Sequence, residues 1–158
     1  MEAEFKRQIA LHLDESMRKL EVAWPGLSEE QVWWRPNEHC LAPANQLIHL
    51  TGNLRQYVGT ALCGLAPVRT RDAEFAAREG PSKDALYAAF VEQFAFAKTR
   101  LAAADDLLAE HLIQGKMFTE VGVWVHVTEH VSYHTGQLIY AAKALRDAGY
   151  DFYGGWAL

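Results

Sequence analysis

Apolar residues recur at every third or fourth position over long stretches of this chain, which is the spacing of an amphipathic helix. In the first stretch these residues are Phe5, Ile9, Leu13, Met17 and Leu20. The pattern predicts four long helices in all, over residues 2–23, 43–62, 82–110 and 119–148. No segment shows the sustained alternation of apolar and polar residues that a half-buried strand requires. The chain is therefore predicted to be all-α.

Proline, serine and glycine residues mark the ends of these helices. Pro25 and Gly26 are expected to end the first helix, because the residue before a proline disfavours helical geometry. Pro43 suits the first turn of the second helix. Ser82 can cap the start of the third helix, and Gly149 can end the fourth.

We expect the four helices to pack as a four-helix bundle, in a single domain that covers residues 1–158. Short joints would allow a simple up-and-down path. The connection over residues 64–81 is long enough to permit a crossover instead, in which helices two and three run parallel. The aromatic tail over residues 150–156 is expected to pack on the bundle or on a second subunit, so a homodimer is expected.

Composition narrows the classes of partner. The net charge of −5 argues against nucleic acid, because phosphate binding requires a basic surface. No run of about 18 apolar residues is present to span a membrane. The first residues lack the apolar core of a signal peptide, so we expect no membrane partner and a cytoplasmic location. Cys40 and Cys63 are expected to be reduced, with Cys63 packed in the core.

Three histidines stand four residues apart in the last predicted helix, at His126, His130 and His134. Four residues turn a helical side chain by about 40° and raise it by about 6 Å, so neighbours in the row lie one above the other. Two of them can bind one metal ion, whereas the outer pair is about 12 Å apart and cannot easily share it. Spacing alone does not decide which pair binds, and a further ligand must come from elsewhere in the chain.

The second predicted helix offers that ligand. His49 lies in its apolar sequence, Asn53 follows one turn later, and Gln56 lies near the same line. Both polar faces would point into the bundle, where a histidine is costly unless it is hydrogen-bonded or bound to metal. A buried hydrogen-bond network would explain one histidine, but three in register favour a metal site.

The lone His49 in a second helix, followed by His130-Val-Ser-Tyr-His134-Thr-Gly-Gln137 in the last, resembles the DinB superfamily of metalloenzymes, also called DinB/YfiT-like. The resemblance spans nearly the whole chain. It implies a DinB-like four-helix bundle with a metal triad of His49, His130 and His134. It also implies that the metal is zinc or nickel and that the protein pairs as a homodimer.

Other polar residues are expected around this triad. The resemblance gives Asn53 and Tyr133 as pocket residues. It leaves His126 as a neighbour of the ligands or as a packing residue. Gln56 and Gln137 lie near the same lines of their helices, so we expect them to line the cleft as well.

Three histidines without a carboxylate leave a divalent ion with open positions, as in a catalytic site, where the ion lowers the pKa of bound water or thiol. The resemblance implies activation of a low-molecular-weight thiol for transfer to an electrophilic small molecule. A thiol needs less help from a base than water does, and Glu129, about 100° from His130 on the helical wheel, is expected to face away. A metal-hydroxide hydrolase and a non-catalytic metal-binding stress-response protein are the alternatives.

Overall fold

The computed structural model of the protein describes residues 1–146 and 149–153. Within these residues the chain forms six α-helices and one two-stranded antiparallel sheet. The prediction of a mostly helical chain is confirmed. No helix in the described part of the chain has the length and apolar character needed to cross a membrane.

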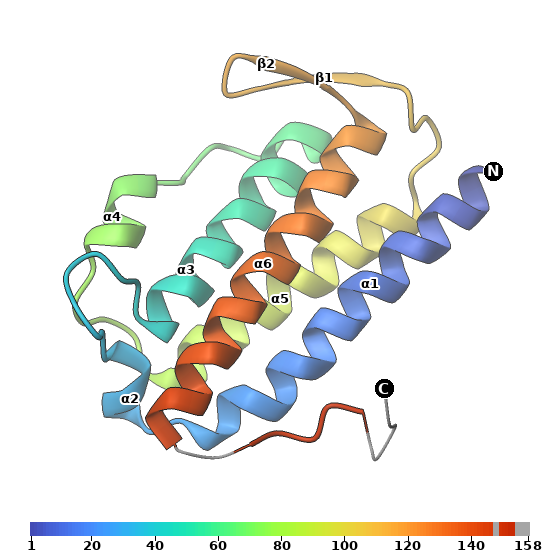
Figure 1. The fold of residues 1–158 in the computed structure, drawn as a ribbon. Coiled ribbons are helices and arrows are strands. Elements are labelled where there is room, and N and C mark those ends of the chain that lie inside the picture. Colours follow the sequence, from blue (N-terminus) through green and yellow to red (C-terminus); the bar gives the residue numbers. More distant parts are fainter. Residues whose placement is uncertain (147–148, 154–158) are drawn as a thin grey trace.

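Four long helices lie side by side (Figure 1). They are α1 (Glu2–Ala23), α3 (Pro43–Leu54), α5 (Lys83–Ala102) and α6 (Glu120–Arg146). Helix α6 packs between α1 and α3, and α5 packs against α3 and α1 from behind. Helices α3 and α5 run in the same direction, opposite to α1 and α6, so the long connection acts as a crossover.

The apolar stripes of these helices meet in one core. Leu13 and Leu20 of α1, Leu50 of α3, Phe90 of α5 and Trp124 of α6 are each at most 1% exposed. Each such side chain contributes about 1.5–3 kcal/mol through its removal from water. The pattern of the first helix is confirmed, because its predicted apolar residues lie in this core or pack against it.

The second predicted helix has the expected extent but not the expected winding. After α3, the segment Arg55–Leu62 continues as a π-helix, η2. The wider turn of a π-helix is uncommon and is found frequently near functional sites. Gly64, whose φ is 68°, ends the segment, because glycine adopts this left-handed geometry without a steric penalty.

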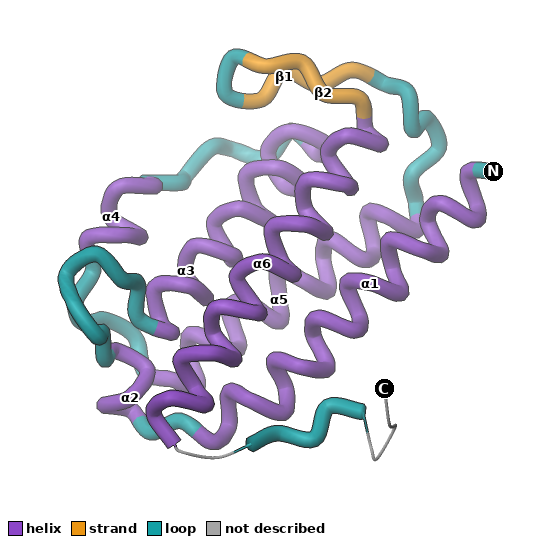
Figure 2. The backbone as a smooth tube through the Cα atoms, viewed as in Figure 1, coloured by secondary structure: helices purple, strands orange, loops and turns teal. Residues whose placement is uncertain are grey.

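The third predicted helix is shorter than expected, and the prediction of no strands is wrong. Helix α5 ends at Ala102, where Nζ of Lys6 donates to the carbonyl of Ala102 at 3.2 Å. The strands β1 (Glu110–Ile113) and β2 (Lys116–Thr119) then form a hairpin at one end of the molecule (Figure 2). Gln114 and Gly115, with φ of 52° and 79°, make the two-residue turn that matches the twist of a hairpin.

The connection between α3 and α5 contains a helix that the pattern did not predict, α4 (Arg71–Ala76). It is tied to the start of α3 by the side chain of Asn45, whose Nδ2 donates to the carbonyls of Glu74 and Ala77 at 2.8 and 3.1 Å. Arg35, which follows the short helix α2 (Glu29–Trp33), donates to the same carbonyl of Ala77 at 2.6 Å. These bonds hold the connection against α3.

Two smaller expectations have different outcomes. Cys63 is exposed at the end of η2, so its prediction as a core residue is wrong; like Cys40, it is a free thiol. In the described part of the tail, Tyr150 packs against the core and its hydroxyl donates to the carbonyl of Ala23 at 3.5 Å. The last two residues of the fourth predicted helix and Trp156 lie outside the described residues.

Candidate metal centre

Polar side chains face one another across the contact between α3 and α6. Because the two helices run in opposite directions, successive turns pair in reverse order. The pairs are Gln46 with His134, His49 with His130, and Asn53 with His126. A row of paired polar side chains therefore runs along the contact between α3 and α6.

Three of these side chains form a compact group of possible ligands. One nitrogen from each of His49, His130 and His134 lies within 4.8 Å of the other two. The Nε2 atoms of His49 and His130 are 2.9 Å apart. Two imidazole nitrogens that share a tetrahedral zinc ion at about 2.0–2.1 Å are separated by about 3.3 Å. His49 and His134 are buried and His130 is half-buried, so the group is open to solvent on the side of His130.

The ring of His49 is oriented by a buried carboxylate. Its Nδ1 lies 2.9 Å from Oε2 of Glu74, which is only 7% exposed, and 3.0 Å from Nη2 of Arg69. Because Nη2 already donates to Oε2 at 2.7 Å and a carboxylate can only accept, we assign the proton on Nδ1 to the bond with Glu74. A proton on Nδ1 leaves the lone pair of Nε2 free, which is how a carboxylate prepares a histidine to bind metal. His134 is held in the same way, because its Nδ1 donates to Oε1 of Gln46. These residues therefore fit a divalent ion bound by Nε2 atoms.

Glu74 is itself fixed by Arg69. The guanidinium donates to both carboxylate oxygens at 2.7 Å through Nε and Nη2, and its Nη1 donates to Oε1 of Gln56 at 2.5 Å. Burial alone would raise the pKa of Glu74, but the hydrogen bonds from Arg69 and His49 outweigh it and hold that pKa below its usual range. The carboxylate is therefore ionised, and its charge offsets that of Arg69.

The sequence of α3 makes room for this ion pair at Gly52. A Cβ atom at this position would lie 2.2 Å from Oε1 of Glu74 and 3.1 Å from Nε of Arg69. A glycine inside a helix costs about 0.5–1 kcal/mol relative to alanine. Because Gly52 has no side chain, the carboxylate of Glu74 can lie against α3 beside His49.

Burial lowers the pKa of two histidines of the group, His130 and His134. The pKa of His130 is lowered to about 3, first by burial and then by the charges of the neighbouring histidines. The pKa of His134 is lowered to about 4, first by burial and then by the charge of His49. A metal ion requires neutral imidazole, so both side chains are in the binding form at neutral pH.

The remaining predicted site residues lie around the group in different ways. His126 is not one of the grouped ligands; its ring stacks on Tyr57 at 4.0 Å and on His130 at 5.3 Å between centroids. Tyr133 is 61% exposed, and its ring meets the edge of His134 at 5.0 Å. Asn53 is buried, with its Oδ1 unpartnered in the described part of the chain.

Two glutamines expected in the cleft have other surroundings. Gln56 accepts from Arg69 and from Nε2 of Gln114 at 3.1 Å, so it links the ion pair to the tip of the hairpin. Gln137 is half-buried, and its Oε1 has no hydrogen-bond partner among the residues that the structure describes.

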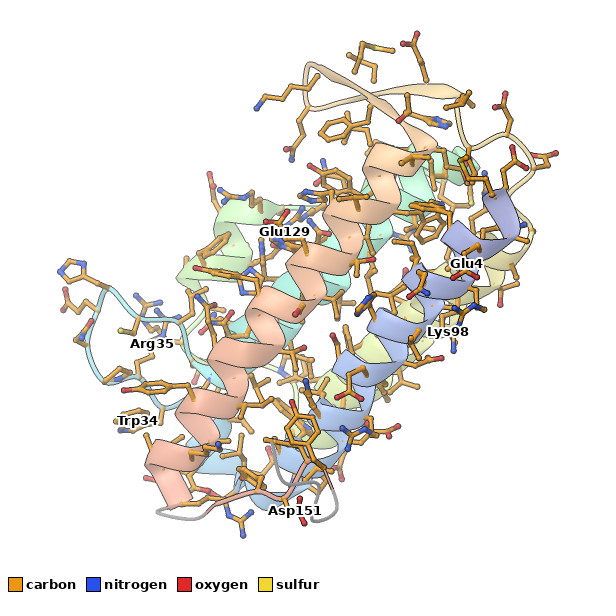
Figure 3. The ribbon with its side chains drawn as sticks, turned by 45° about the vertical axis from the view of Figure 1, so that its right-hand side comes forward. Glu4, Trp34, Arg35, Lys98, Glu129 and Asp151 are labelled. Carbon is orange, nitrogen blue, oxygen red and sulfur yellow. The ribbon has the colours of Figure 1, made fainter. Side chains whose placement is uncertain are left out.

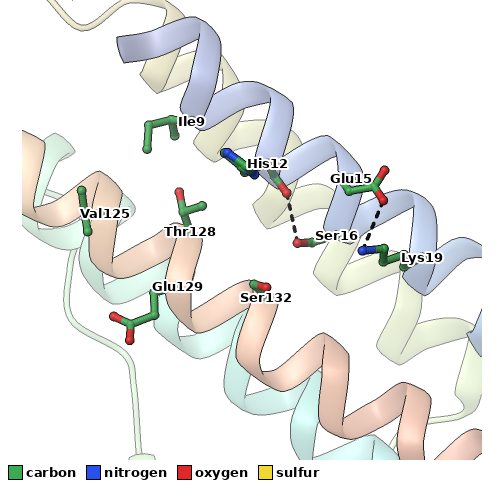
Figure 4. Close-up of a pocket in the computed structure, with 9 residues that line it drawn as sticks. All are labelled: Ile9, His12, Glu15, Ser16, Lys19, Val125, Thr128, Glu129 and Ser132. Carbon is green, nitrogen blue, oxygen red and sulfur yellow. Dashed lines mark hydrogen bonds and ion pairs between the residues drawn. The ribbon is translucent and has the colours of Figure 1, made fainter. Parts of the chain in front are cut away.

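A cavity of about 210 Å³ opens beside the histidines, lined by His126, Glu129, His130 and Tyr133. Glu129 thus borders the site, although the helical wheel placed it on another face. The carboxylate lies on the side of α6 away from α1 (Figure 3). A larger groove of about 390 Å³ between α1 and α6 contains none of the three grouped histidines (Figure 4).

Sequence reasoning missed the residues that support the group. Gln46 precedes His49 by three residues, so helical spacing could have found it. Glu74 and Arg69 lie in the long connection, where no periodic pattern points to them. Only the packing of the connection on α3 brings them to His49.

A protein-family model matches nearly the whole chain. The model of a family described as a protein of unknown function (DUF1572) matches residues 2–153. No curated protein matches the chain, and no solved structure matches it.

Replacing Glu74 by glutamine should weaken metal binding by about 10- to 100-fold, because the amide accepts the Nδ1 proton of His49 without the carboxylate charge. Competition against a chelating dye measures this affinity. Glu79→Gln, at an exposed glutamate of the same connection, is the control and should bind as the wild type does. Equal affinities for all three proteins would contradict the role of Glu74.

The metal-free protein should lose stability as the pH falls from 7 to 5. In the unfolded chain a histidine has its ordinary pKa of about 6.5, whereas burial in the folded protein lowers the pKa of His130 to about 3 and that of His134 to about 4. Between pH 7 and pH 5 the unfolded state therefore binds more protons than the folded state. The free energy of unfolding decreases as the pH is lowered. Urea unfolding at several pH values measures the slope. The slope of the free energy of unfolding against pH should be flatter in the double variant His130→Ala/His134→Ala. It should be unchanged in the control His39→Ala, at an exposed loop histidine. A double variant with the slope of the wild type would contradict the prediction.

Proposed function

The chain belongs to the DUF1572 family, and we propose that it is a metal-dependent enzyme whose ion is held by His49, His130 and His134. We propose that this site activates a low-molecular-weight thiol for transfer to an electrophilic small molecule. One observation carries the metal site. Two of the three histidines have Nδ1 held by an acceptor, Glu74 or Gln46, which frees Nε2 on the side of the third.

The resemblance to the DinB superfamily supports the finer parts of this proposal. It gives the same three histidines as ligands, zinc or nickel as the metal, and a four-helix bundle as the fold. The four long helices of the structure, with α3 and α5 parallel, are compatible with that fold. The proposal that the site binds a thiol is supported by the resemblance and by the three neutral histidine ligands.

A divalent ion held by three neutral imidazoles keeps its full charge and lowers the pKa of a thiol or water bound to it. The chain's own residues supply the rest. Glu74 and Gln46 fix two of the rings, so that little reorganisation is needed when a ligand binds. His130, at the half-buried edge of the group, faces the cavity through which a small molecule can reach the site.

The cavity favours an enzyme over a purely structural site. A structural zinc site is closed by a fourth protein ligand. The group of possible ligands in the described part of the chain contains three residues, and a cavity adjoins it. The arrangement therefore leaves room for a ligand that does not belong to the protein.

Thiol binding is tested with the cobalt-substituted protein. Titration with small thiols should produce sulfur-to-cobalt charge-transfer absorption, and His130→Ala should abolish it because one ligand is lost. His39→Ala is the matched control. Spectra that do not change with any thiol, together with turnover of activated esters that rises near neutral pH, would replace thiol transfer by hydrolysis.

A further inference from the structure

An unpaired carboxylate lies at the cavity beside the histidines. Glu129 is exposed, and among residues 1–146 and 149–153 it has no salt-bridge partner. Glu129 also lines the groove between α1 and α6, but its carboxylate is turned away from His12 and Lys19 of α1 (Figure 4). The negative charge is therefore directed to the cavity side of α6, where Glu129 lines the wall together with His130.

An aromatic ring lies one helical turn away. Tyr133 follows Glu129 by four residues, so the two side chains are neighbours on the surface of α6. Both line the cavity, and Tyr133 is 61% exposed. A carboxylate beside an accessible aromatic ring is a combination that binds ammonium groups, through a charge-assisted hydrogen bond and a cation–π contact.

The other charges near the cavity do not cancel this preference. The ring of His126 stacks on Tyr57 and on His130, at 4.0 and 5.3 Å between centroids, and burial lowers its pKa more than the charge of Glu129 raises it. Arg69 also acts on this ring, but its guanidinium is paired with Glu74 at 2.7 Å. Glu129 remains as the unpaired protein charge on the cavity wall.

We propose that Glu129 and Tyr133 bind a primary ammonium group, so that the thiol used at the histidine site is a small aminothiol. The identity of the ligand as a thiol rests on the proposed function, whereas the binding of the ammonium group does not. The volume of about 210 Å³ suits a molecule of a few heavy atoms. His130 lines the same cavity as Glu129 and Tyr133, so a molecule bound at these two residues lies beside the histidine group.

The first test compares two thiols of the same size in the cobalt-substituted protein. Cysteamine carries an ammonium group where propane-1-thiol carries a methyl group. Their dissociation constants are measured from the charge-transfer absorption at low salt, in the wild type and in Glu129→Gln. Because the two thiols differ in acidity, the measured quantity is the change in their affinity ratio between the two proteins.

The preference for cysteamine should fall about five-fold in Glu129→Gln, the loss expected for an exposed ion pair next to an aromatic ring. It should fall in Tyr133→Leu as well and be retained in Tyr133→Phe, which keeps the ring. Glu92→Gln, at an exposed glutamate of α5, should leave the ratio unchanged. A ratio that is the same in the wild type and in Glu129→Gln would overturn the proposal.

A second test needs neither metal nor thiol. Ligand-observed NMR on the metal-free protein should detect binding of butylammonium, with butan-1-ol as the neutral control, and Glu129→Gln should remove the difference. If no thiol gives charge-transfer absorption but butylammonium binds through Glu129, the ammonium site stands and the thiol function fails. If butylammonium and butan-1-ol behave alike in the wild type, the ammonium site fails.

Discussion

The hydrogen bond from Nδ1 of His49 to the buried carboxylate of Glu74 determines which nitrogen of the ring is turned toward His130. With the proton held on Nδ1, the lone pair of Nε2 points into the contact between α3 and α6. The rest of the site depends on this orientation. If the ring carried its proton on the other nitrogen, the three histidines would still lie close together but would not offer three lone pairs to one ion.

That orientation involves parts of the chain that lie far apart in sequence. The connection between α3 and α5 must lie against α3, and Asn45 and Arg35 hold it there through its backbone carbonyls. Gly52 must lack a side chain for Glu74 to approach. Arg69 must neutralise the carboxylate, because an unpaired buried charge is strongly destabilising. The crossover therefore does more than join two parallel helices, since it also supplies the group that orients a ligand.

The sequence predicts much of this arrangement and omits a specific part of it. Periodicity predicts the long helices, because each buries one apolar stripe, and α1 begins and ends where the pattern does. The row of histidines in α6 and His49 in α3 follow from helical spacing, and the resemblance selects the pair His130 and His134. The hairpin was missed because its two strands have four residues each, too few to show a sustained alternation of apolar and polar positions. Glu74 could not be predicted, because its approach to His49 depends on tertiary packing rather than on any local period.

Metal content is the most direct test of the central claim, that His49, His130 and His134 hold one divalent ion. Elemental analysis of the untagged protein should find close to one equivalent of metal in the wild type and in His39→Ala, and almost none in His130→Ala. Circular dichroism of each sample establishes that the helices are retained. A folded His130→Ala protein that carries as much metal as the wild type would contradict the account.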